Sequence, residues 1–487
     1  MRTPINEVAT HRNPHLDDLV AITLLVTFGE QKYQFPNGGP KVVFEETDTS
    51  PSTLQVGMGG GDLDEHKPEG RLAGQCATSL TAQALNLAEI PALWTLLSEV
   101  QRADTQPGQT HFELGEALKT LFGYGEGFTP QMALEIVRRV VEGFIHLDGE
   151  PIPEPVHPQA FIGPTLFLSE GTSVVNTLVM PKGAGIQELA AMWLLVNRNN
   201  GRIIFPKGEI DLVEIGPEEL ERLEQLQVME DAVFIGFVGG HFGTGGSYPT
   251  FREAMDFFGV RKDPELHVLQ KEATRWETQA AKPLELPSLI ALLSAGGMSL
   301  EEIYTLLVDP MFAAQATSSH EFMVKCPPQF ARNGTMVNVG EMQIAFVHSD
   351  LHGMNRWLRA VMKVDVVVQR STNRNVAIFT ETACRAVVYD IARAILLAEG
   401  GDADARAELE EMILHGRDRT MPAPADLWYL FGAAGQILNG STTHEVLPTH
   451  LSNQDLQVLV VEAVNAYAWR KAQGEAGAAA KAEETAD

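Results

Sequence analysis

Two short segments near the start of the chain combine histidine with acidic residues. Their candidate ligands are His11, His15 and Asp17 in the first segment, and Asp62, Asp64, Glu65 and His66 in the second. Imidazole nitrogen and carboxylate oxygen atoms bind Mn²⁺, Mg²⁺ and Zn²⁺, and a bound ion can generate hydroxide near neutral pH. The residue types and their spacing therefore predict a divalent metal site, with Mn²⁺ as the first choice and Mg²⁺ or Zn²⁺ as alternatives.

Each segment also has a purely structural interpretation. Asp17 stands at the expected start of a helix, where a carboxylate caps the helix or interacts with its dipole. His11 or His15 alone would be an ordinary loop histidine. The second segment follows Gly59, Gly60 and Gly61, and an exposed acidic turn is the alternative there.

The elements that must position these residues follow a strand, loop, helix, strand order. We expect strands at 7–10, 41–46 and 53–58, and helices at 16–28 and 77–102. This order favours a parallel sheet with ligands at the carboxyl ends of its strands. Both histidine-acid segments would then follow strand ends.

The chain also contains a second, similar copy of this unit. Without a gap, 9–43 aligns with 179–213, 56–63 with 235–242, and 102–106 with 275–279. Both copies continue into pairs of expected helices, at 113–122 and 129–145 in the first and at 287–295 and 299–308 in the second. Three matching blocks in the same order predict an internal duplication.

The second copy keeps the scaffold and lacks the candidate ligands. His11, His15 and Asp17 correspond to Pro181, Gly185 and Gln187, and residues 64–66 correspond to Gly243, Thr244 and Gly245. If the histidines and acids of the first copy served only the fold, the second copy should need them too. The glycine-rich segment 239–246 resembles a phosphate-holding loop, but its position makes it the degenerate counterpart of 59–66.

From about residue 318 the chain resembles neither copy. We expect strands at 342–347, 364–369 and 376–380, and helices at 381–397 and 456–472. If 353–362 is also helical, its N-terminus is a natural phosphate seat. The candidate substrate-binding residues around it are His348, Asp350, His352, Arg356 and Arg370. A strand-end loop capped by Asp350 is the alternative.

The predicted fold class is therefore α/β, with a duplicated parallel-sheet unit followed by an α+β C-terminal domain. The expected divisions are 1–150 for the metal-binding unit, 160–315 for its degenerate copy, 318–472 for the substrate-binding domain and 473–487 for a flexible tail, either disordered or a frayed helix. A length of 487 residues fits two or three domains.

Composition narrows the function class. The formal charge of −28 argues against a protein coated in basic surface for binding nucleic acid, although 351–380 carries five basic residues against Asp365. No apolar run approaches the roughly 20 residues that cross a bilayer. The start of the chain lacks a secretory pattern, and three scattered cysteines form no disulfide framework, so we expect a cytoplasmic protein with no membrane partner.

These residues resemble motifs of the DHH phosphoesterase superfamily and, within it, of the melanocyte-proliferating-gene family of metal-dependent hydrolases. Thr10-His11, His15-Leu16-Asp17 and Asp64-Glu65-His66 resemble its T-H, H-x-D and D-H-H motifs, and 366–380 resembles its C-terminal hairpin. The resemblance covers about 1–70 and 340–380.

The resemblance implies a two-metal phosphoester hydrolase, with exonuclease activity in some members. It implies that His11, His15, Asp17 and Asp64 bind metal, and that His66 contacts the scissile phosphate or acts as an acid. Two residues depart from the pattern: Glu65 replaces the first histidine of D-H-H, and Gln55 stands where a bridging aspartate is expected. A second metal is in doubt unless Asp62 substitutes for that aspartate.

The predicted function is hydrolysis of a phosphodiester or phosphoanhydride by metal-activated water, with Asp64 and His66 as catalytic residues. The expected partner is a phosphate-containing small molecule or single-stranded nucleic acid, and a homo-oligomer is compatible with the sequence. The alternative is a non-catalytic scaffold or nucleotide sensor whose metal site has decayed, which Gln55 and Glu65 favour. Amide hydrolysis at a single metal is a third possibility, because the same ion polarises carbonyl groups.

Overall fold

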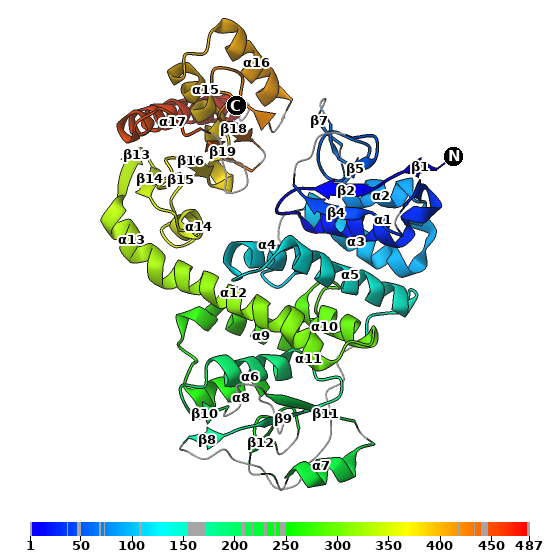
Figure 1. Ribbon diagram of the computed structural model, residues 1–487. Helices are drawn as coiled ribbons and strands as arrows, with labels where there is room; N and C mark the ends of the chain where they lie inside the picture. The colour runs from blue at the N-terminus through cyan, green and yellow to red at the C-terminus, as the bar shows by residue number, and fades with distance from the viewer. Residues whose placement is uncertain are drawn as a thin grey trace. The chain divides into compact units, whose positions relative to one another are not determined.

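The computed structural model describes most of the chain and divides it into two compact units, Met1–Ser319 and His320–Asp487 (Figure 1). The described residues are 2–36, 38–45, 50–67, 70–72, 74–106, 110–153, 172–205, 210–216, 218–227, 229, 231–237, 240–243, 250–415, 419–432, 434–439 and 447–484. The protein is a mixed α/β fold with several parallel sheets, as the sequence predicts.

The first unit begins with a three-stranded parallel sheet in the order β4-β2-β5. Its strands are β2 (Glu7–Thr10), β4 (Lys41–Phe44) and β5 (Thr53–Gln55), and the short pair β1 (Thr3–Pro4) and β3 (Tyr33–Gln34) forms beside them. The central strand β2 buries Val8 and Ala9 completely. Because β2 lies in the middle, the loop after it opens at the carboxyl edge of the sheet beside the loop after β5.

Helix α1 (Leu16–Phe28) follows β2 and begins where Pro14 ends the loop. The backbone amide of His15 donates to the carboxyl group of Asp18 at 2.9 Å, which completes a capping box at the helix start. The helix ends at Gly29, where the 3₁₀ turn η1 (Gly29–Gln31) begins. The predicted helix at 16–28 is therefore confirmed at both ends.

The predicted helix at 77–102 is wrong as a single element. The structure has α2 (Ala77–Ala84), the 3₁₀ turn η2 (Leu87–Glu89) and α3 (Pro91–Thr105). Asn86 adopts a left-handed backbone with φ of 55°, and Ile90 is extended because it precedes Pro91. The hairpin of β6 (His66–Lys67) and β7 (Gly70–Arg71) precedes these helices, and α4 (Leu114–Tyr124) and α5 (Pro130–Leu147) follow them.

The second half of the unit has the same strand order and direction as the first. Its parallel sheet has the order β11-β9-β12, formed by β9 (Thr177–Pro181), β11 (Asp211–Ile215) and β12 (Ala232–Phe234), with β8 (Ser173–Val174) paired to β10 (Ile203–Ile204). A parallel bridge joins Ile235 to Phe242, as another joins Val56 to Leu63 in the first half.

As in the first half, a helix directly follows the central strand of the second sheet. The helices of the second half are α6 (Ile186–Asn197), α7 (Leu220–Gln227), α8 (Thr250–Phe258), η3 (Pro264–Leu266), α9 (His267–Thr278), α10 (Leu286–Ala295), α11 (Leu300–Ile303), the π-helical turn η4 (Tyr304–Val308) and α12 (Asp309–His320). One hydrophobic core runs through both halves.

The two halves meet through a reciprocal pair of backbone hydrogen bonds. Leu114 donates to the carbonyl of Leu284 at 2.9 Å, and Leu286 donates to the carbonyl of Phe112 at 3.0 Å. Between these bonds lie Glu113 and Glu285, two carboxylates with no exposed surface.

Both glutamates are ion-paired across the junction or within their own half. Glu113 pairs with Arg102 and with Lys282 at 3.3 Å, and Glu285 pairs with Arg275 at 2.9 Å. A hydroxyl from the opposite half, that of Thr110, also donates to Glu285 at 2.8 Å. Each half therefore supplies groups that compensate the buried charge of the other.

The second unit contains a mixed seven-stranded sheet in the order β13-β14-β15-β16-β19-β18-β17. The strands are β13 (Gly334–Val339), β14 (Met342–His348), β15 (Val366–Arg370), β16 (Val376–Thr380), β17 (Arg419–Thr420), β18 (Tyr429–Phe431) and β19 (Gln436–Asn439). Only β14 and β15 are parallel neighbours. The three strands predicted here are therefore confirmed within two residues at each end.

Helices cover both faces of this sheet. They are α13 (Cys326–Asn333) after the π-helical turn η5 (Glu321–Lys325), α14 (Met354–Ala360), η6 (Thr382–Cys384), α15 (Val387–Ala398), α16 (Ala403–Leu414) and α17 (Asn453–Glu484). Ile344 and Val366 face one core with α15 and α17, whereas Ala345 and Val367 face the other core with α13 and α14. This alternation is the period-two pattern of a sheet buried on both sides.

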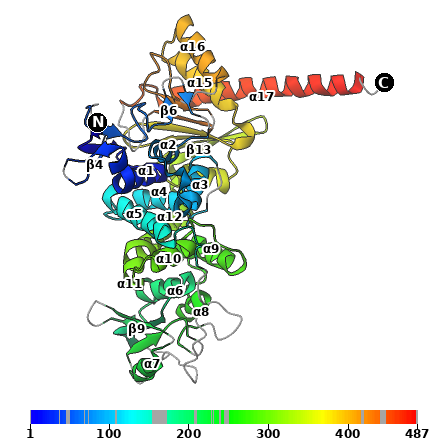
Figure 2. The same cartoon turned by 90° about the vertical axis from the view of Figure 1, so that its right-hand side faces the viewer.

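Two helix predictions in this unit need correction. The helix expected at 381–397 begins only at Val387, after a 3₁₀ turn, and α17 continues beyond 472 to Glu484 (Figure 2). The helical part of the 473–487 tail agrees with the frayed-helix alternative and fits its alanine, glutamate and lysine content. In the described part of the chain, no helix has the length and apolar character needed to cross a membrane.

Candidate metal centre

The loops that follow β2 and β5 meet at the carboxyl edge of the first sheet. The hydroxyl of Thr10 donates to the carbonyl of Val56 at 3.0 Å, and Nε2 of His11 lies 2.7 Å from the carbonyl oxygen of Gly57. These contacts bring the start of the first histidine-acid segment against Val56 and Gly57, which precede the glycine run 59–61 of the second segment. The predicted position at strand ends therefore agrees with the sheet topology.

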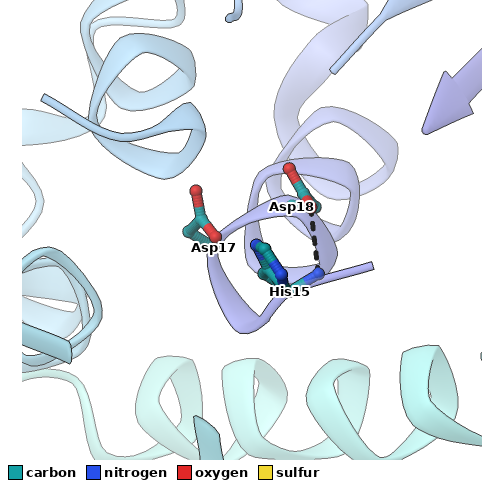
Figure 3. A group of neighbouring side chains, drawn as sticks. All are labelled: His15, Asp17 and Asp18. Atoms are coloured by element: carbon teal, nitrogen blue, oxygen red, sulfur yellow. Dashed lines mark hydrogen bonds between the residues drawn. The ribbon is translucent and has the colours of Figure 1, made fainter. Parts of the chain in front are cut away.

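The first group of candidate ligands lies at the N-terminus of α1. His15, Asp17 and Asp18 each offer one ligand atom, and these three atoms lie within 4.8 Å of one another (Figure 3). Asp17 is 4% exposed and Asp18 is 2% exposed, whereas His15 keeps contact with solvent. Two carboxyl groups are thus withdrawn from water beside one imidazole.

The electrostatics of this group favour a cation. The pKa of Asp18 is raised well above its ordinary value by burial and by the nearby charges of Asp17, Glu65 and Asp104. Partial burial, with the neighbouring charges of Lys119 and His11, lowers the pKa of His15. A neutral imidazole that can donate a nitrogen lone pair therefore stands beside carboxyl groups that repel one another.

The second group consists of Asp64, Glu65 and His66, whose ligand atoms also lie within 4.8 Å of one another. The carboxylate of Asp64 accepts from the backbone amides of Gly60 at 2.7 Å and His66 at 2.8 Å. Nδ1 of His66 is 3.3 Å from both Asp64 Oδ1 and Glu65 Oε1. Asp64 and Glu65 are buried, and the His66 side chain is 60% exposed.

These contacts determine the protonation state of Asp64. Burial alone would raise its pKa, but the hydrogen bonds from His66 and Gly60 outweigh burial, and the pKa is lowered. Asp64 therefore remains an anion, and the amides of Gly60 and His66 hold its two oxygens in fixed directions. A carboxylate that binds a metal ion is commonly oriented by hydrogen bonds of this kind.

Asp104 is a site residue that sequence reasoning missed. It lies on α3, and its ligand atom is within 4.8 Å of those of Asp17 and Cys76. The amide of Ala77, in the first turn of α2, donates to Asp17 at 3.2 Å, so α2 and α3 close the site from the side. Burial and Asp17 raise the pKa of the Cys76 thiol to about 12, so oxygen and nitrogen atoms are the available donors.

The sequence aligns Asp104 with an acidic residue of the second copy. The block 102–106 matches 275–279, which places Asp104 opposite Glu277. In the second half Glu277 pairs with Arg252 at 3.8 Å, whereas Asp104 adds its charge to a group of carboxylates. The acid is retained in both halves, but its surroundings differ.

Comparison with the second half indicates that Asp18 and Asp17 have different roles. Glu188 occupies the place of Asp18, accepts from the amide of Gly185 at 3.0 Å and is 1% exposed. A Cβ on Gly57 would lie 1.7 Å from Oδ1 of Asp18, and one on Gly236 would lie 2.5 Å from Cγ of Glu188. The acid at this position therefore packs against a left-handed glycine in both halves, which is a structural role.

Asp17, by contrast, has no acidic counterpart. Gln187 takes its place and donates to the carbonyl of Ala273 at 3.3 Å. At the position of Asp64 the second half has Gly243, where a Cβ would lie 1.8 Å from the carbonyl oxygen of Phe237. That backbone has no room for a ligating side chain. Residues 244 and 245, opposite Glu65 and His66, lie outside the described residues.

Two other predicted ligands are placed differently. His11 is outside both groups, although its charge affects His15 and its ring contacts the carbonyl of Gly57. Asp62 is exposed, belongs to none of the candidate groups among the described residues, and acts on Tyr33, whose pKa is raised by burial and by this carboxylate. Gln55 lies against Gly59, whose Cβ would be 2.0 Å from Gln55 Oε1.

The predicted substrate-binding residues belong to the second unit, where Asp350 interacts with His348 and His352. Asp350 accepts hydrogen bonds from the amide and hydroxyl of Thr372, and these bonds lower its pKa. Arg356 lies over the ring of Phe322, with 5.8 Å from guanidinium to ring centroid. His352 is exposed, and His348 and Arg370 are register partners at the ends of β14 and β15.

The phosphate seat expected at the helix following His352 needs correction. The amide of Gly353, which precedes α14, donates to the carboxylate of Glu321 at 2.6 Å. Glu321 is buried, so a protein carboxylate already occupies this helix start. The helix itself, Met354–Ala360, is confirmed but is two residues shorter at its C-terminal end than expected.

Comparison of the chain with protein-family models and with curated proteins finds no match to either.

Proposed function

We propose that the first unit is a divalent-cation-dependent hydrolase of phosphate esters or phosphoanhydrides. One observation carries this proposal: the buried carboxyl group of Asp18 is acted on by the charges of Asp17, Glu65 and Asp104, which come from three separate parts of the chain, beside His15. Like charges gathered in this way attract either a proton or a cation. We infer a divalent ion, because oxygen and nitrogen atoms of these residues are ligands that such an ion can bind.

The donor set fits a hard or borderline divalent ion. Carboxylate oxygens suit Mg²⁺ and Mn²⁺, and a neutral imidazole nitrogen suits Zn²⁺ and other transition metals. Carboxylates combined with an imidazole, as in the group with His15 and Asp17 and in the group of Asp64, Glu65 and His66, therefore favour Mn²⁺, with Mg²⁺ and Zn²⁺ as alternatives. We assign Asp18 to the scaffold, because its counterpart Glu188 packs against glycine in the same way.

When bound, such an ion lowers the pKa of a water molecule and polarises a phosphoryl oxygen. Around it, Asp64 remains ionised because two backbone amides hold it, and Glu65 is buried next to it. His66 reaches solvent while contacting both carboxylates, so it is the residue that can move a proton to the leaving oxygen. Asp64 and His66 are thus the proposed catalytic residues.

The two halves share a strand order but differ in their candidate ligands, which supports an origin by duplication in which the second half kept the fold and lost the ligands. Strand order, the two parallel bridges and the acid-glycine contacts agree between halves, whereas Asp17 and Asp64 are replaced by Gln187 and Gly243. These likenesses are also compatible with the DHH resemblance. The substrate remains a phosphate-containing small molecule or single-stranded nucleic acid, and a cytoplasmic location remains a prediction.

The test uses the full chain, stripped with a chelator and refilled with Mn²⁺, Mg²⁺ or Zn²⁺. We expect bound metal by elemental analysis, a rise in the thermal midpoint, and hydrolysis of bis-nitrophenyl phosphate or short single-stranded DNA. Asp17→Asn should lower both metal content and rate, the rate by about 100-fold or more. Gln187→Asn, at the matching position of the second half, is the control and should change neither.

The outcomes also separate the sensor alternative, which Gln55 at the end of β5 continues to favour. Metal binding without hydrolysis of any tested ester would support a sensor. Full activity in the Asp17→Asn variant, or equal losses in both variants, would show that the proposed centre is wrong.

A further inference from the structure

A groove at the ends of β14 and β15 has the composition of an anion site. It has a volume of about 150 Å³, and its polar or aromatic lining includes Asn333, Thr335, Phe346, His348, Arg370 and Gln457. All of these residues belong to the second unit. We name it the β14–β15 groove.

The sheet register accounts for this composition. His348 is the parallel partner of Arg370, and two residues earlier Phe346 is the partner of both Val368 and Thr335. Side chains two residues apart lie on the same face of a strand, so the pair of His348 and Arg370 lies directly beyond the row of Thr335, Phe346 and Val368. The start of α17, which carries Gln457, borders these side chains.

Arg370 is fixed in the groove by neutral acceptors. Its Nη1 donates to the carbonyl oxygen of Leu451 and to Oδ1 of Asn453, both at 2.9 Å. Within the described part of the chain, it pairs with no carboxylate. Its positive charge is therefore held in one orientation but not neutralised, in a protein whose formal charge is −28.

A second cation strengthens the local field. Arg374 lies in the tight turn between β15 and β16, in which the amide of Arg374 donates to the carbonyl of Ser371 at 2.9 Å and the amide of Ser371 donates to the carbonyl of Asn375 at 3.0 Å, and its charge acts on Arg370. Two guanidinium groups held near each other attract a counter-ion that carries more than one negative charge. A phosphoryl dianion meets this requirement, and a single carboxylate does not.

We propose that the β14–β15 groove binds a phosphoryl dianion, either inorganic phosphate or the terminal monoester of a nucleotide. Arg370 and His348 contact the phosphoryl oxygens, and the hydroxyl of Thr335 and the amides of Asn333 and Gln457 donate from the sides. The volume holds a phosphoryl group and a few more atoms, and Phe346 supplies an apolar surface for an ester substituent. This proposal does not rest on the metal centre in the first unit.

The experiment is calorimetric titration of the full chain in chelator, so that no divalent ion can recruit phosphate to the first unit. The probes are inorganic phosphate, a nucleoside 5′-monophosphate and the same nucleoside without phosphate. We expect both phosphorylated probes to bind and the nucleoside not to bind. Tighter binding of the monophosphate assigns the site to a terminal ester, and equal binding assigns it to phosphate itself.

Gln457→Glu is the decisive variant, because Gln457 is exposed and the change adds one negative charge with almost no change in shape. Repulsion of the dianion should weaken binding about tenfold or more. Gln454→Glu, on the same exposed first turn of α17 but outside the groove, is the charge-matched control and should stay within about twofold. Absence of binding by both phosphorylated probes, or equal weakening by the two variants, would overturn the proposal.

Discussion

Gly57 offers a sharp test of the packing that supports the candidate metal centre. It has a left-handed backbone with φ of 66°, and a Cβ there would lie 1.7 Å from Oδ1 of Asp18. Asp18 is 2% exposed and cannot withdraw into solvent without breaking its hydrogen bond with the amide of His15. Gly57→Ala should therefore destabilise the protein and distort the start of α1.

The magnitude follows from two contributions. An alanine in the left-handed region costs about 1–2 kcal/mol, partly offset by about 0.4–1 kcal/mol from the lower entropy of the unfolded chain. Displacement of Asp18 leaves a buried donor without its acceptor, which costs about 1–3 kcal/mol more. Only the second contribution depends on the site.

Gly127→Ala is the matched control. Gly127 has a φ of 67°, but a Cβ there would meet no atom within 4 Å, so only the backbone contribution applies. Urea denaturation in chelator should show that Gly57→Ala loses about 1–3 kcal/mol more than Gly127→Ala in the free energy of unfolding. Gly57→Ala should also weaken the stabilisation by Mn²⁺. Equal losses in the two variants would refute the packing argument.

Three further predictions concern charges and thiols. The pKa of Asp18 is raised in the folded state, so the stability that this group contributes is present below its unfolded pKa and is lost as the pH rises through its folded pKa. In chelator, the thermal midpoint of Asp18→Asn should therefore rise relative to that of the unaltered protein as the pH increases above the ordinary range of a carboxyl group, and a difference that is constant with pH would contradict this. Glu113→Gln should cost about 1–3 kcal/mol in the free energy of unfolding, because Arg102 and Lys282 lose a buried partner while keeping some contact with solvent. Glu116→Gln, in the first turn of α4, should cost under about 1 kcal/mol, and similar costs would show that the junction charges matter little. Cys76, Cys326 and Cys384 are buried, with thiol pKa values raised by burial to about 12, 12 and 11, so a thiol reagent at pH 8 should label them only after denaturation, and rapid labelling of the native protein would disagree.

Elements whose signals were local could be predicted from the sequence. The helix at 16–28 has a capping acid, an apolar body and a terminal glycine, and each of these acts within one or two turns. The prediction of one helix at 77–102 missed the break between α2 and α3, because the apolar spacing continues across it. Pro91 is the local signal for this break, since a residue before proline is disfavoured in a helix. Local backbone chemistry prevailed there over periodicity.

The candidate site was predictable only where its residues follow strand ends. His15, Asp17, Asp64 and His66 follow strands that pair in parallel, so residue type and sheet topology together place them. Asp104 lies in the last turn of α3, and its position depends on how α3 packs beside α2, which no local pattern encodes. Asp62 was predicted as a ligand because it is acidic and close in sequence to Asp64, but its residue type does not determine where its side chain points, and it belongs to none of the candidate groups among the described residues.

The reciprocal junction between the halves limits which deletions and substitutions the second half can tolerate during evolution. Gly143 of α5 packs against Leu292 of α10 so closely that a Cβ would lie 2.8 Å from Leu292 Cγ, and one core runs through both halves. Deleting the second half would expose that apolar surface and remove Lys282 from Glu113, which would keep only Arg102 of its own half. In the part of the chain that the structure describes, every candidate ligand group lies in the first half, so a substitution in the shared core of the second half should still impair the candidate site.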